Sequence, residues 1–238
     1  MFSRTKLLIS LFNVIFVFGA EGFITKCKQD DNTCILTSAK AAIAHMIAGD
    51  PSLGVEALDP IFTEKIEGNF TTLNFAFYKS YLAGLKDCDF TNVQIDLEKT
   101  KLHVDLLCPH LDMKGDYNIH GVLITLPVEG TGTYNMKYKN TKVAFDGTLN
   151  AVTSPDGNSH LHIKNFKLNP DAGGVVFDFK NLFNGDKDLS DAVHNFANEN
   201  WAVIAKEFQQ PIFDENFKQF VKGINKYLKT ISKDIYLQ

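Results

Sequence analysis

The stretch LFNGDKDLSDAVHNFANENW (182–201), which continues into PIFDENFKQFVKGINKYLKTI (211–231), decides the fold. Its apolar residues recur every three or four positions, which is the spacing of one face of an α-helix. We therefore predict a long helix between Leu182 and Leu237. The apolar stripe on this helix comprises Val193, Ala197, Ile204, Phe208, Ile212, Phe213, Phe217, Phe220, Ile224, Tyr227, Leu228 and Ile231. Pro211 removes a backbone donor, so we expect it to kink the helix or to split it into two abutting segments.

The chain before this helix predicts strands, because apolar and polar residues alternate with a period of two from Leu73 onward. Turn signals arrive about every ten residues, as in an antiparallel meander. The run 117–128 is apolar on both faces, which indicates a strand covered on both sides, and GTG (130–132) is expected to turn the chain after it. SLGVEALDPIF (52–62) is expected to be a loop or an edge segment, because Gly and Pro interrupt it.

The order of elements is a short amphipathic helix over Cys34–Ala48, many strands and then the long helix, which places the protein in the α+β class. A helix this rich in apolar residues cannot bury them alone. We predict a strongly curved antiparallel β-sheet that wraps the long C-terminal helix, with an apolar tunnel between the two. No linker or repeat divides the chain, so residues 21–238 are predicted to form a single domain.

Residues 1–20 are typical of a secretory signal peptide, with two cations ahead of an apolar run over 7–18 and small residues after it. That run is shorter than the ~20 residues of a membrane span, so we expect an exported protein without stable membrane insertion. The net charge of −4 becomes more negative when the two cations are removed, which argues against nucleic acid as a partner. We expect a monomer that needs no cofactor. The sequon NFT predicts N-glycosylation of Asn69.

Four cysteines in an exported chain suggest two disulfides, for which three pairings are possible. Cys27 and Cys34 flank a polar turn. Cys88 and Cys108 flank a predicted hairpin, in which a single β-bulge would bring them together. The hairpin is expected to pair Val93 with Val104 and Ile95 with Leu102. We therefore propose the bridges Cys27–Cys34 and Cys88–Cys108, and no zinc site, because C-x-x-C spacing is missing.

Catalytic motifs are missing from the sequence: there is no G-x-S-x-G elbow, no H-E-x-x-H and no Walker loop, so we predict that the protein is not an enzyme. His160 and His162 could share one strand face, but no third ligand can be named, so we interpret them as a solvated pair and expect no metal. A row of lysines follows the last helix: Lys218, Lys222, Lys226, Lys229 and Lys233. It could steer the protein to an anionic membrane or a ligand carboxylate, but we favour a solvated helix face.

Twenty Phe in an exported chain without a catalytic constellation favour a carrier of apolar small molecules. Strand and helix phase predict a tunnel lining of Phe75, Phe77, Leu102, Val104, Tyr117, Ile119, Ile204, Phe208, Phe217 and Phe220. The alternative for any one of them is ordinary core, the default for an apolar position. A second hypothesis is a secreted signalling or interaction protein without a bound ligand. A lipid-modifying hydrolase is the weakest hypothesis, because no nucleophile–base pair is visible.

Several stretches carry a resemblance to a known family: Cys27 with Cys34, GDPSLGVEALDPIF (49–62), MKGDYNIHGVLITLPVEGTG (113–132) and, above all, the stretch 182–201. Over essentially the whole mature chain, the sequence resembles the insect takeout and juvenile-hormone-binding protein family. The resemblance implies a tubular lipid-binding fold and a secreted carrier of juvenile hormone, fatty-acid-like or other terpenoid-like ligands.

The cysteines refine what the resemblance implies. The pair Cys27–Cys34 matches the N-terminal disulfide of the family. The pair Cys88–Cys108 does not match the second bridge of the haemolymph hormone carriers, which involves the C-terminal half. This departure favours a takeout-like lipid carrier over a carrier of juvenile hormone itself.

Overall fold

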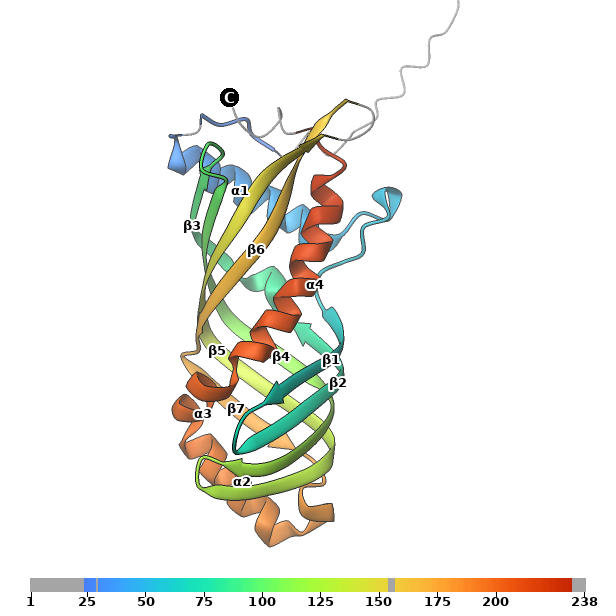
Figure 1. Ribbon diagram of the computed structural model, residues 1–238, viewed down its shortest axis with the longest axis vertical. Coiled ribbons are helices and arrows are strands. Elements are labelled where there is room, and N and C mark those ends of the chain that lie inside the picture. Colours follow the sequence, from blue (N-terminus) through green and yellow to red (C-terminus); the bar gives the residue numbers. More distant parts are fainter. Residues whose placement is uncertain (1–23, 29, 154–156, 233–238) are drawn as a thin grey trace, which may run out of the picture.

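The computed structural model describes residues 24–28, 30–153 and 157–232, so the predicted signal peptide and Lys233 lie outside the described residues. Figure 1 shows an elongated molecule in which one curved sheet runs along most of the length. Helix α1 lies at one end of the molecule and α2 at the other, and α4 runs along the open side of the sheet. The predicted α+β class, in which a curved antiparallel sheet wraps a helical C-terminal segment, is confirmed.

Within the described residues, the sheet has seven strands, all paired antiparallel. They are β1 (Ile61–Asn69), β2 (Leu73–Ala83), β3 (Asp89–Asp96), β4 (Lys101–Leu123), β5 (Leu126–Thr153), β6 (Ser159–Asp171) and β7 (Gly174–Phe179). β4 and β5 are 23 and 28 residues long and pair with each other along most of their length. One half of this long pair is flanked by β2 and β7, and the other half by β3 and β6. The molecule therefore has two halves that share two strands.

The helices are α1 (Asn32–Ala48), α2 (Lys187–Glu199), α3 (Trp201–Phe208) and α4 (Gln210–Leu228). The predicted long C-terminal helix is thus three helices in succession. The split beside Pro211 is confirmed, because α3 ends at Phe208 and Pro211 stands in the first turn of α4, where a missing backbone donor costs nothing. The break between α2 and α3 was not predicted; there the Asn200 side chain donates to the Phe196 carbonyl and ends α2.

Side-chain amides on α4 attach it to both free edges of the curved sheet. The Asn225 side chain accepts from the Ile163 amide at 2.8 Å and donates to the Ile163 carbonyl at 2.9 Å, which imitates a neighbouring strand along β6. On the opposite side, the Thr63 hydroxyl of β1 donates to the Asn216 side chain at 3.0 Å. α4 therefore closes the curved sheet between β1 and β6 (Figure 1).

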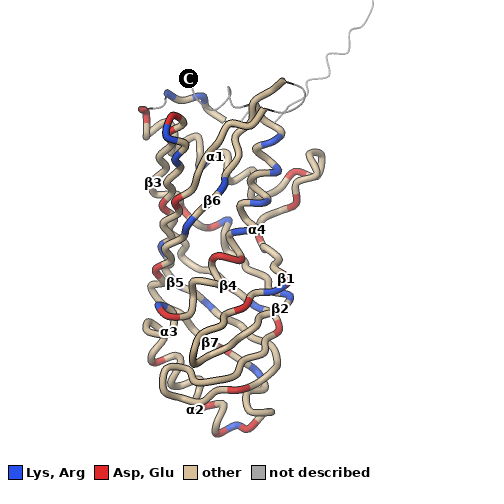
Figure 2. Tube along the Cα trace, in the orientation of Figure 1, with Lys and Arg blue, Asp and Glu red and all other residues tan. Residues whose placement is uncertain are grey.

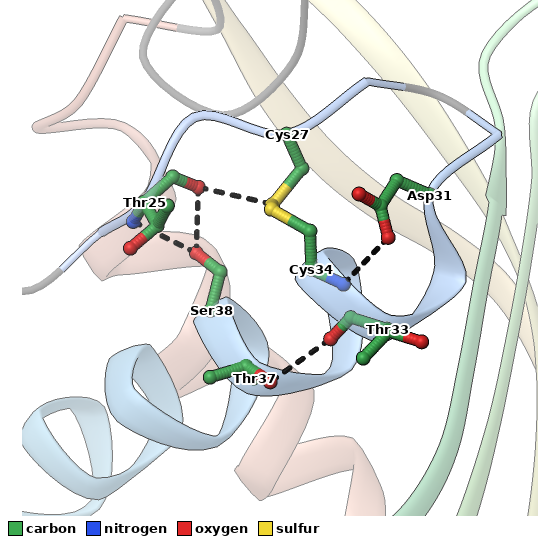
Figure 3. The surroundings of a disulfide bond; sticks show 7 residues. All are labelled: Thr25, Cys27, Asp31, Thr33, Cys34, Thr37 and Ser38. Carbon is green, nitrogen blue, oxygen red and sulfur yellow. Dashed lines mark hydrogen bonds between the residues drawn. A yellow bond between two sulfur atoms is a disulfide. The ribbon is translucent and has the colours of Figure 1, made fainter.

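The predicted hairpin and both predicted disulfides are confirmed. Val93 pairs with Val104, and the expected bulge lies between Phe90 and Asn92. The bridges are Cys27–Cys34 and Cys88–Cys108. Both bridges lie in the half of the molecule that contains α1 and β3. Figure 3 shows Cys27–Cys34, which joins the segment before α1 to the first turn of that helix.

The predicted turn at 130–132 is wrong. β4 ends at Leu123, the chain turns at 124–125, and 130–132 lies inside β5. The two glycines instead allow the backbone at Lys180 and Leu182 to lie close to β5. A Cβ on Gly132 would clash with the Lys180 carbonyl oxygen, and Gly130 forms a β-bridge with Leu182. The run 117–128 is consequently the end of one strand and the start of the next.

Candidate functional site: two apolar cavities inside the sheet

The first cavity, called cavity 1 below, lies in the half of the molecule that contains α2, α3 and β7. The empty space between its walls, including space that is open to solvent, is about 580 Å³. Its walls are formed by Leu73, Phe75, Phe77, Ile119, Leu123, Val128, Met136, Phe177, Phe179, Leu182, Val193, His194, Ala197, Ile204, Phe208 and Ile212. His194 is the one side chain with a polar group among them. Phe75, Phe77, Tyr134 and Phe179 form a run of ring contacts with centroids 4.4–5.7 Å apart, so much of this wall is aromatic.

Helix α2 covers cavity 1 and is attached to the edge of β7 by two polar side chains. The Asn198 side chain accepts from the Phe177 amide at 2.8 Å and donates to the Phe177 carbonyl at 3.1 Å. His194 lies one helical turn earlier, and its Nε2 accepts from the Phe179 amide at 2.9 Å. Because Nε2 accepts, the imidazole is neutral and its proton is on Nδ1. These hydrogen bonds satisfy two backbone amides and one backbone carbonyl on the edge of β7, which would otherwise be open to water.

The second cavity, called cavity 2, lies in the half that contains α1, β3 and β6. The empty space between its walls, including space that is open to solvent, is about 780 Å³. Its walls are formed by Cys27, Ile35, Ser38, Ala39, Ala42, Ile43, Met46, Phe90, Val93, Ile95, Leu102, Val104, Leu149, Leu161, Ile163, Ile224 and Leu228. The Ser38 hydroxyl donates to the Thr25 carbonyl at 2.9 Å and accepts from the Thr25 amide at 3.0 Å (Figure 3). Its hydrogen bonds are therefore made within the protein.

Helix α1 covers cavity 2 and is attached covalently at its start. The bridge Cys27–Cys34 joins the first turn of α1 to the segment before it, and the Asp31 side chain accepts from the Cys34 amide at 2.9 Å (Figure 3). The bridge Cys88–Cys108 joins the start of β3 to β4, and both of these strands contribute side chains to the wall of cavity 2. Cavity 2 is consequently bounded by two cross-linked elements.

Between the cavities lies a packed layer, called the waist below. It consists of Leu111, Met113, Tyr138, Phe213, Asn216, Phe217 and Phe220. Phe213 contacts Tyr138 edge to face at 5.5 Å between ring centroids, and Phe217 lies 5.7 Å from Phe220. Burial raises the pKa of Tyr138, so this phenol stays protonated at neutral pH. The waist is a buried, largely aromatic layer that contains a few polar groups.

Comparison with known proteins identifies the family. Residues 7–238 match the family model described as haemolymph juvenile hormone binding protein. The chain belongs to this family. It is 27% identical to the circadian clock-controlled protein daywake of Drosophila melanogaster, over 93% of this chain and 91% of that protein. It is 21% identical to a putative beta-carotene-binding protein of Schistocerca gregaria, over 77% and 72%. The crystal structure of Takeout 1 from Epiphyas postvittana superposes with a TM-score of 0.85 and 28% identity, over 90% of this chain and all of that chain.

The structure of this family member separates the predicted lining residues into three groups. Phe75, Phe77, Ile119, Ile204 and Phe208 lie on the wall of cavity 1. Leu102 and Val104 lie on the wall of cavity 2.

The other three lie on neither wall. Phe217 and Phe220 belong to the waist. Tyr117 stands behind the wall of cavity 1, where its hydroxyl donates to the Lys180 carbonyl at 2.8 Å and its ring packs against Phe179. Desolvation by burial raises the pKa of Tyr117 to about 12.

Sequence reasoning missed the contributions of α1, α2 and β7 to the cavity walls. The strand alternation at Val175, Phe177 and Phe179 was a usable signal, because it marks Phe177 and Phe179 as one face. The apolar face of α1 was also visible in the sequence, at Ile35, Ala42 and Met46. What the sequence did not give is the position of α1 and α2 over opposite ends of the sheet.

Other candidate groups have structural roles. His160 is buried and its Nδ1 lies 2.9 Å from the Ile231 carbonyl, so the interpretation of a solvated pair is wrong for this residue. Within the described ranges, no group of three or more His, Cys, Asp or Glu side chains is arranged to hold a metal ion. Lys218, Lys222 and Lys226 are exposed along α4, as expected of a solvated face (Figure 2). Among the residues that the structure describes, no helix is both long and apolar enough to cross a membrane.

Proposed function

We propose that this protein is an exported carrier of a hydrophobic small molecule, which it holds between the curved sheet and the helices. The observation that carries the proposal is the pair of internal cavities, whose walls are almost entirely apolar. Concave, mostly apolar spaces of this kind are the usual form of a small-molecule site. His194 and Ser38, the polar side chains on the walls, both bond to the backbone. The cavities therefore suit a ligand that binds through its hydrocarbon surface.

The energy available from such contacts is sufficient for a carrier. Each buried methylene contributes about 0.8 kcal/mol, so a dozen would contribute about 10 kcal/mol before the cost of association. That cost is roughly 4–15 kcal/mol, so at the low end of the cost about 6 kcal/mol remains, which corresponds to a dissociation constant of tens of micromolar. The family description names juvenile hormone and one relative's name contains beta-carotene, both of which are isoprenoids. We propose an isoprenoid or fatty-acyl ligand on these grounds.

Export is supported by the signal-peptide pattern in residues 1–20 and by the two disulfides, which persist in oxidising compartments. The sequon residue Asn69 is exposed at the end of β1, where an oligosaccharyltransferase could reach it. We propose that Asn69 carries a glycan in the secreted protein.

Filling both cavities tests the carrier function. The probe is N-phenyl-1-naphthylamine, whose fluorescence rises in an apolar site. The double variant Ala42→Phe/Ala197→Phe adds a ring to each wall and should weaken probe binding at least tenfold, because the added rings occupy the ligand's volume. The matched control is Ala44→Phe/Ala192→Phe, which adds the same rings on exposed faces of α1 and α2 and should bind like wild type.

Two results would contradict the carrier function. One is equal probe uptake by the filled variant and its control. The other is a wild-type protein that takes up no displaceable probe and yields no lipid on extraction, which would favour a secreted interaction protein with a solid core. Circular dichroism of each variant confirms that it is folded.

A further inference from the structure

The outer face of β1 and β2 carries two exposed aromatic rings. Phe62 on β1 is paired with Tyr81 on β2, and their ring centroids lie 5.1 Å apart. Phe62 is 44% exposed and Tyr81 is 43% exposed, and no other aromatic residue that the structure describes is exposed to this degree. Single exposed apolar side chains are common, whereas aromatic rings that contact each other at the surface are typical of a contact site.

Phe62 also lies on the wall of a hollow between the segment before β1 and helix α4. Leu58 lies close to the helix there because Gly223 has no side chain, and a Cβ on Gly223 would clash with the end of the Leu58 side chain. Lys222 and Lys226 contribute to the helix wall of the same hollow and stand one turn apart. The ring pair is therefore flanked by two cations of α4.

These two lysines have no acidic partner in the protein. Among the described residues, neither Lys222 nor Lys226 forms an ion pair, although Glu56 lies on the wall of the same hollow. The stretch 218–229 contains four Lys and no acid, in a chain whose net charge is −4 (Figure 2). Exposure of the lysines alone fits a solvated helix face; their position beside exposed rings does not follow from solvation.

A further cation lies on the other side of the rings. Lys114 of β4 is paired with Tyr81 and is exposed, so the two side chains share the outer face of the sheet. Along the strands, Lys79 precedes Tyr81 by two residues and Glu64 follows Phe62 by two, and the charges of these two exposed residues offset each other. Cations thus stand on both sides of the ring pair.

The size and chemistry of this surface favour a lipid bilayer over a protein partner. The two rings offer roughly 200 Å² of apolar surface, since a whole aromatic side chain presents about 150–250 Å². A stable protein interface takes roughly 800 Å² from each partner. Aromatic rings beside lysines are, by contrast, typical of surfaces that lie in the head-group region of a membrane, where cations meet lipid phosphates. Charge complementarity therefore indicates an anionic bilayer.

We propose that Phe62, Tyr81, Lys114, Lys222 and Lys226 form a docking surface for an anionic lipid bilayer, which the protein binds peripherally and reversibly. The rings enter the head-group region, and the lysine ammonium groups contact lipid phosphates. Two other side chains of this stretch of α4 line cavity 2, so a docked bilayer lies against the outer side of a cavity wall. Docking itself requires no bound ligand, and it therefore stands or falls independently of the carrier function.

Vesicle flotation tests the docking. The full mature chain should bind vesicles of equal parts phosphatidylcholine and phosphatidylserine at least about tenfold more tightly than vesicles of phosphatidylcholine alone, because each lysine near an anionic surface contributes about fivefold. Binding should weaken as the salt concentration rises. Equal binding to the two kinds of vesicle overturns the proposal. Binding to neither also overturns it, and leaves the rings to a protein partner.

Charge variants locate the surface. Lys222→Gln/Lys226→Gln should weaken binding to the anionic vesicles about twentyfold, at about fivefold per lysine. The matched control Lys139→Gln/Lys142→Gln removes two exposed lysines from β5 and should bind at least about fivefold more tightly than the α4 variant. An equal loss in both variants would show that net charge governs binding, and would overturn the assignment of the surface.

Ring variants test the apolar part. Phe62→Thr/Tyr81→Thr should weaken vesicle binding at least about tenfold, because it removes both rings from the head-group region. Val152→Thr/Val176→Thr changes two apolar residues of similar exposure elsewhere on the sheet and should bind like wild type. Phe62→Trp/Tyr81→Trp should retain or strengthen binding, since the indole ring suits the membrane interface. A folded threonine variant that binds like wild type, or a folded tryptophan variant that binds as weakly as the threonine variant, overturns the proposal.

Probe uptake separates docking from the carrier function. None of the residues substituted in the charge and ring variants lines cavity 1 or cavity 2, so these variants should take up N-phenyl-1-naphthylamine like wild type. Loss of vesicle binding with full probe uptake supports a separate docking surface. Loss of both in a folded variant would show that the substitution reached the cavities, and would overturn the separation. A wild type that binds anionic vesicles but no probe would support docking and contradict the carrier function.

Discussion

The two ends of the molecule close their cavities by different means. At the cavity 2 end, α1 and β3 are each tied by a disulfide. At the cavity 1 end, α2 is held to β7 by hydrogen bonds from Asn198 and His194. α1 also buries more of its side chains than α2, in which Val193 and Ala197 are the buried residues.

This difference indicates which end opens more easily. Segments with few buried apolar contacts open locally at a lower free energy than the rest of a protein. A cross-link, by contrast, limits the conformations that an opened segment can reach. We therefore expect α2 to move first and to admit ligand to cavity 1, while α1 stays in place over cavity 2.

Removing the bridge Cys88–Cys108 should have the largest effect. The variant Cys88→Ser/Cys108→Ser opens a loop of 20 residues, which should lower the free energy of unfolding by about 3 kcal/mol. Urea unfolding measures this loss. Amide exchange should quicken in β3 and α1 and stay unchanged in α2. Faster exchange in α2 alone would contradict the assignment of the bridge to the cavity 2 end.

Substituting Asn198 should have the next largest effect, and at the opposite end. Asn198→Ala leaves the amide and carbonyl of Phe177 without partners, so we expect a loss of about 2 kcal/mol and faster amide exchange in α2. Asn195→Ala, an exposed change in the same helix, is the control and should have little effect. If the two variants behave alike, hydrogen bonding to β7 is not what holds α2.

The smallest expected effect is the contribution of His103 to the pH dependence of the free energy of unfolding. His103 lies between Asp146 and Asp105 on the outer face of the sheet, and the hydrogen bond to Asp146 raises its pKa. The resulting stabilisation is complete below the pKa of His in the unfolded chain, about 6.5, and is lost as pH rises through the raised pKa. His103→Gln should therefore remove a stability difference of about 0.5 kcal/mol between pH 6 and pH 8, measured by urea unfolding. An unchanged difference would show that other groups cause it.

The sequence predicted features that depend on neighbouring residues. The register of Val93 with Val104 follows from alternation in a short hairpin, and the position of Cys88 beside Cys108 follows from that register. The break between α3 and α4 beside Pro211 was predictable, because the effect of proline on a helix is local. β1 was harder to predict as a strand, because Glu64 and Lys65 are both exposed and interrupt its alternation of buried and exposed residues.

Features that depend on distant contacts were not predictable. Gly130 and Gly132 are typical of a turn in the sequence. In the structure they allow the backbone at Lys180 and Leu182, about fifty residues away in the chain, to lie close to β5. Phe217 and Phe208 have the same inward phase on the helix stripe, yet Phe208 lines a cavity and Phe217 packs in the waist. Phase shows that a side chain points inward; whether it meets empty space or another side chain depends on the whole fold.

The carrier function requires that the space between the sheet and the helices holds a guest molecule. Native mass spectrometry of the protein secreted by a producing cell tests it most directly, before and after extraction with organic solvent. We expect a mass above that of the glycosylated chain. Extraction should remove the excess mass and recover its source as an apolar compound. A mass equal to that of the glycosylated chain alone, in a folded protein that also rejects added isoprenoids and fatty acids, would contradict it.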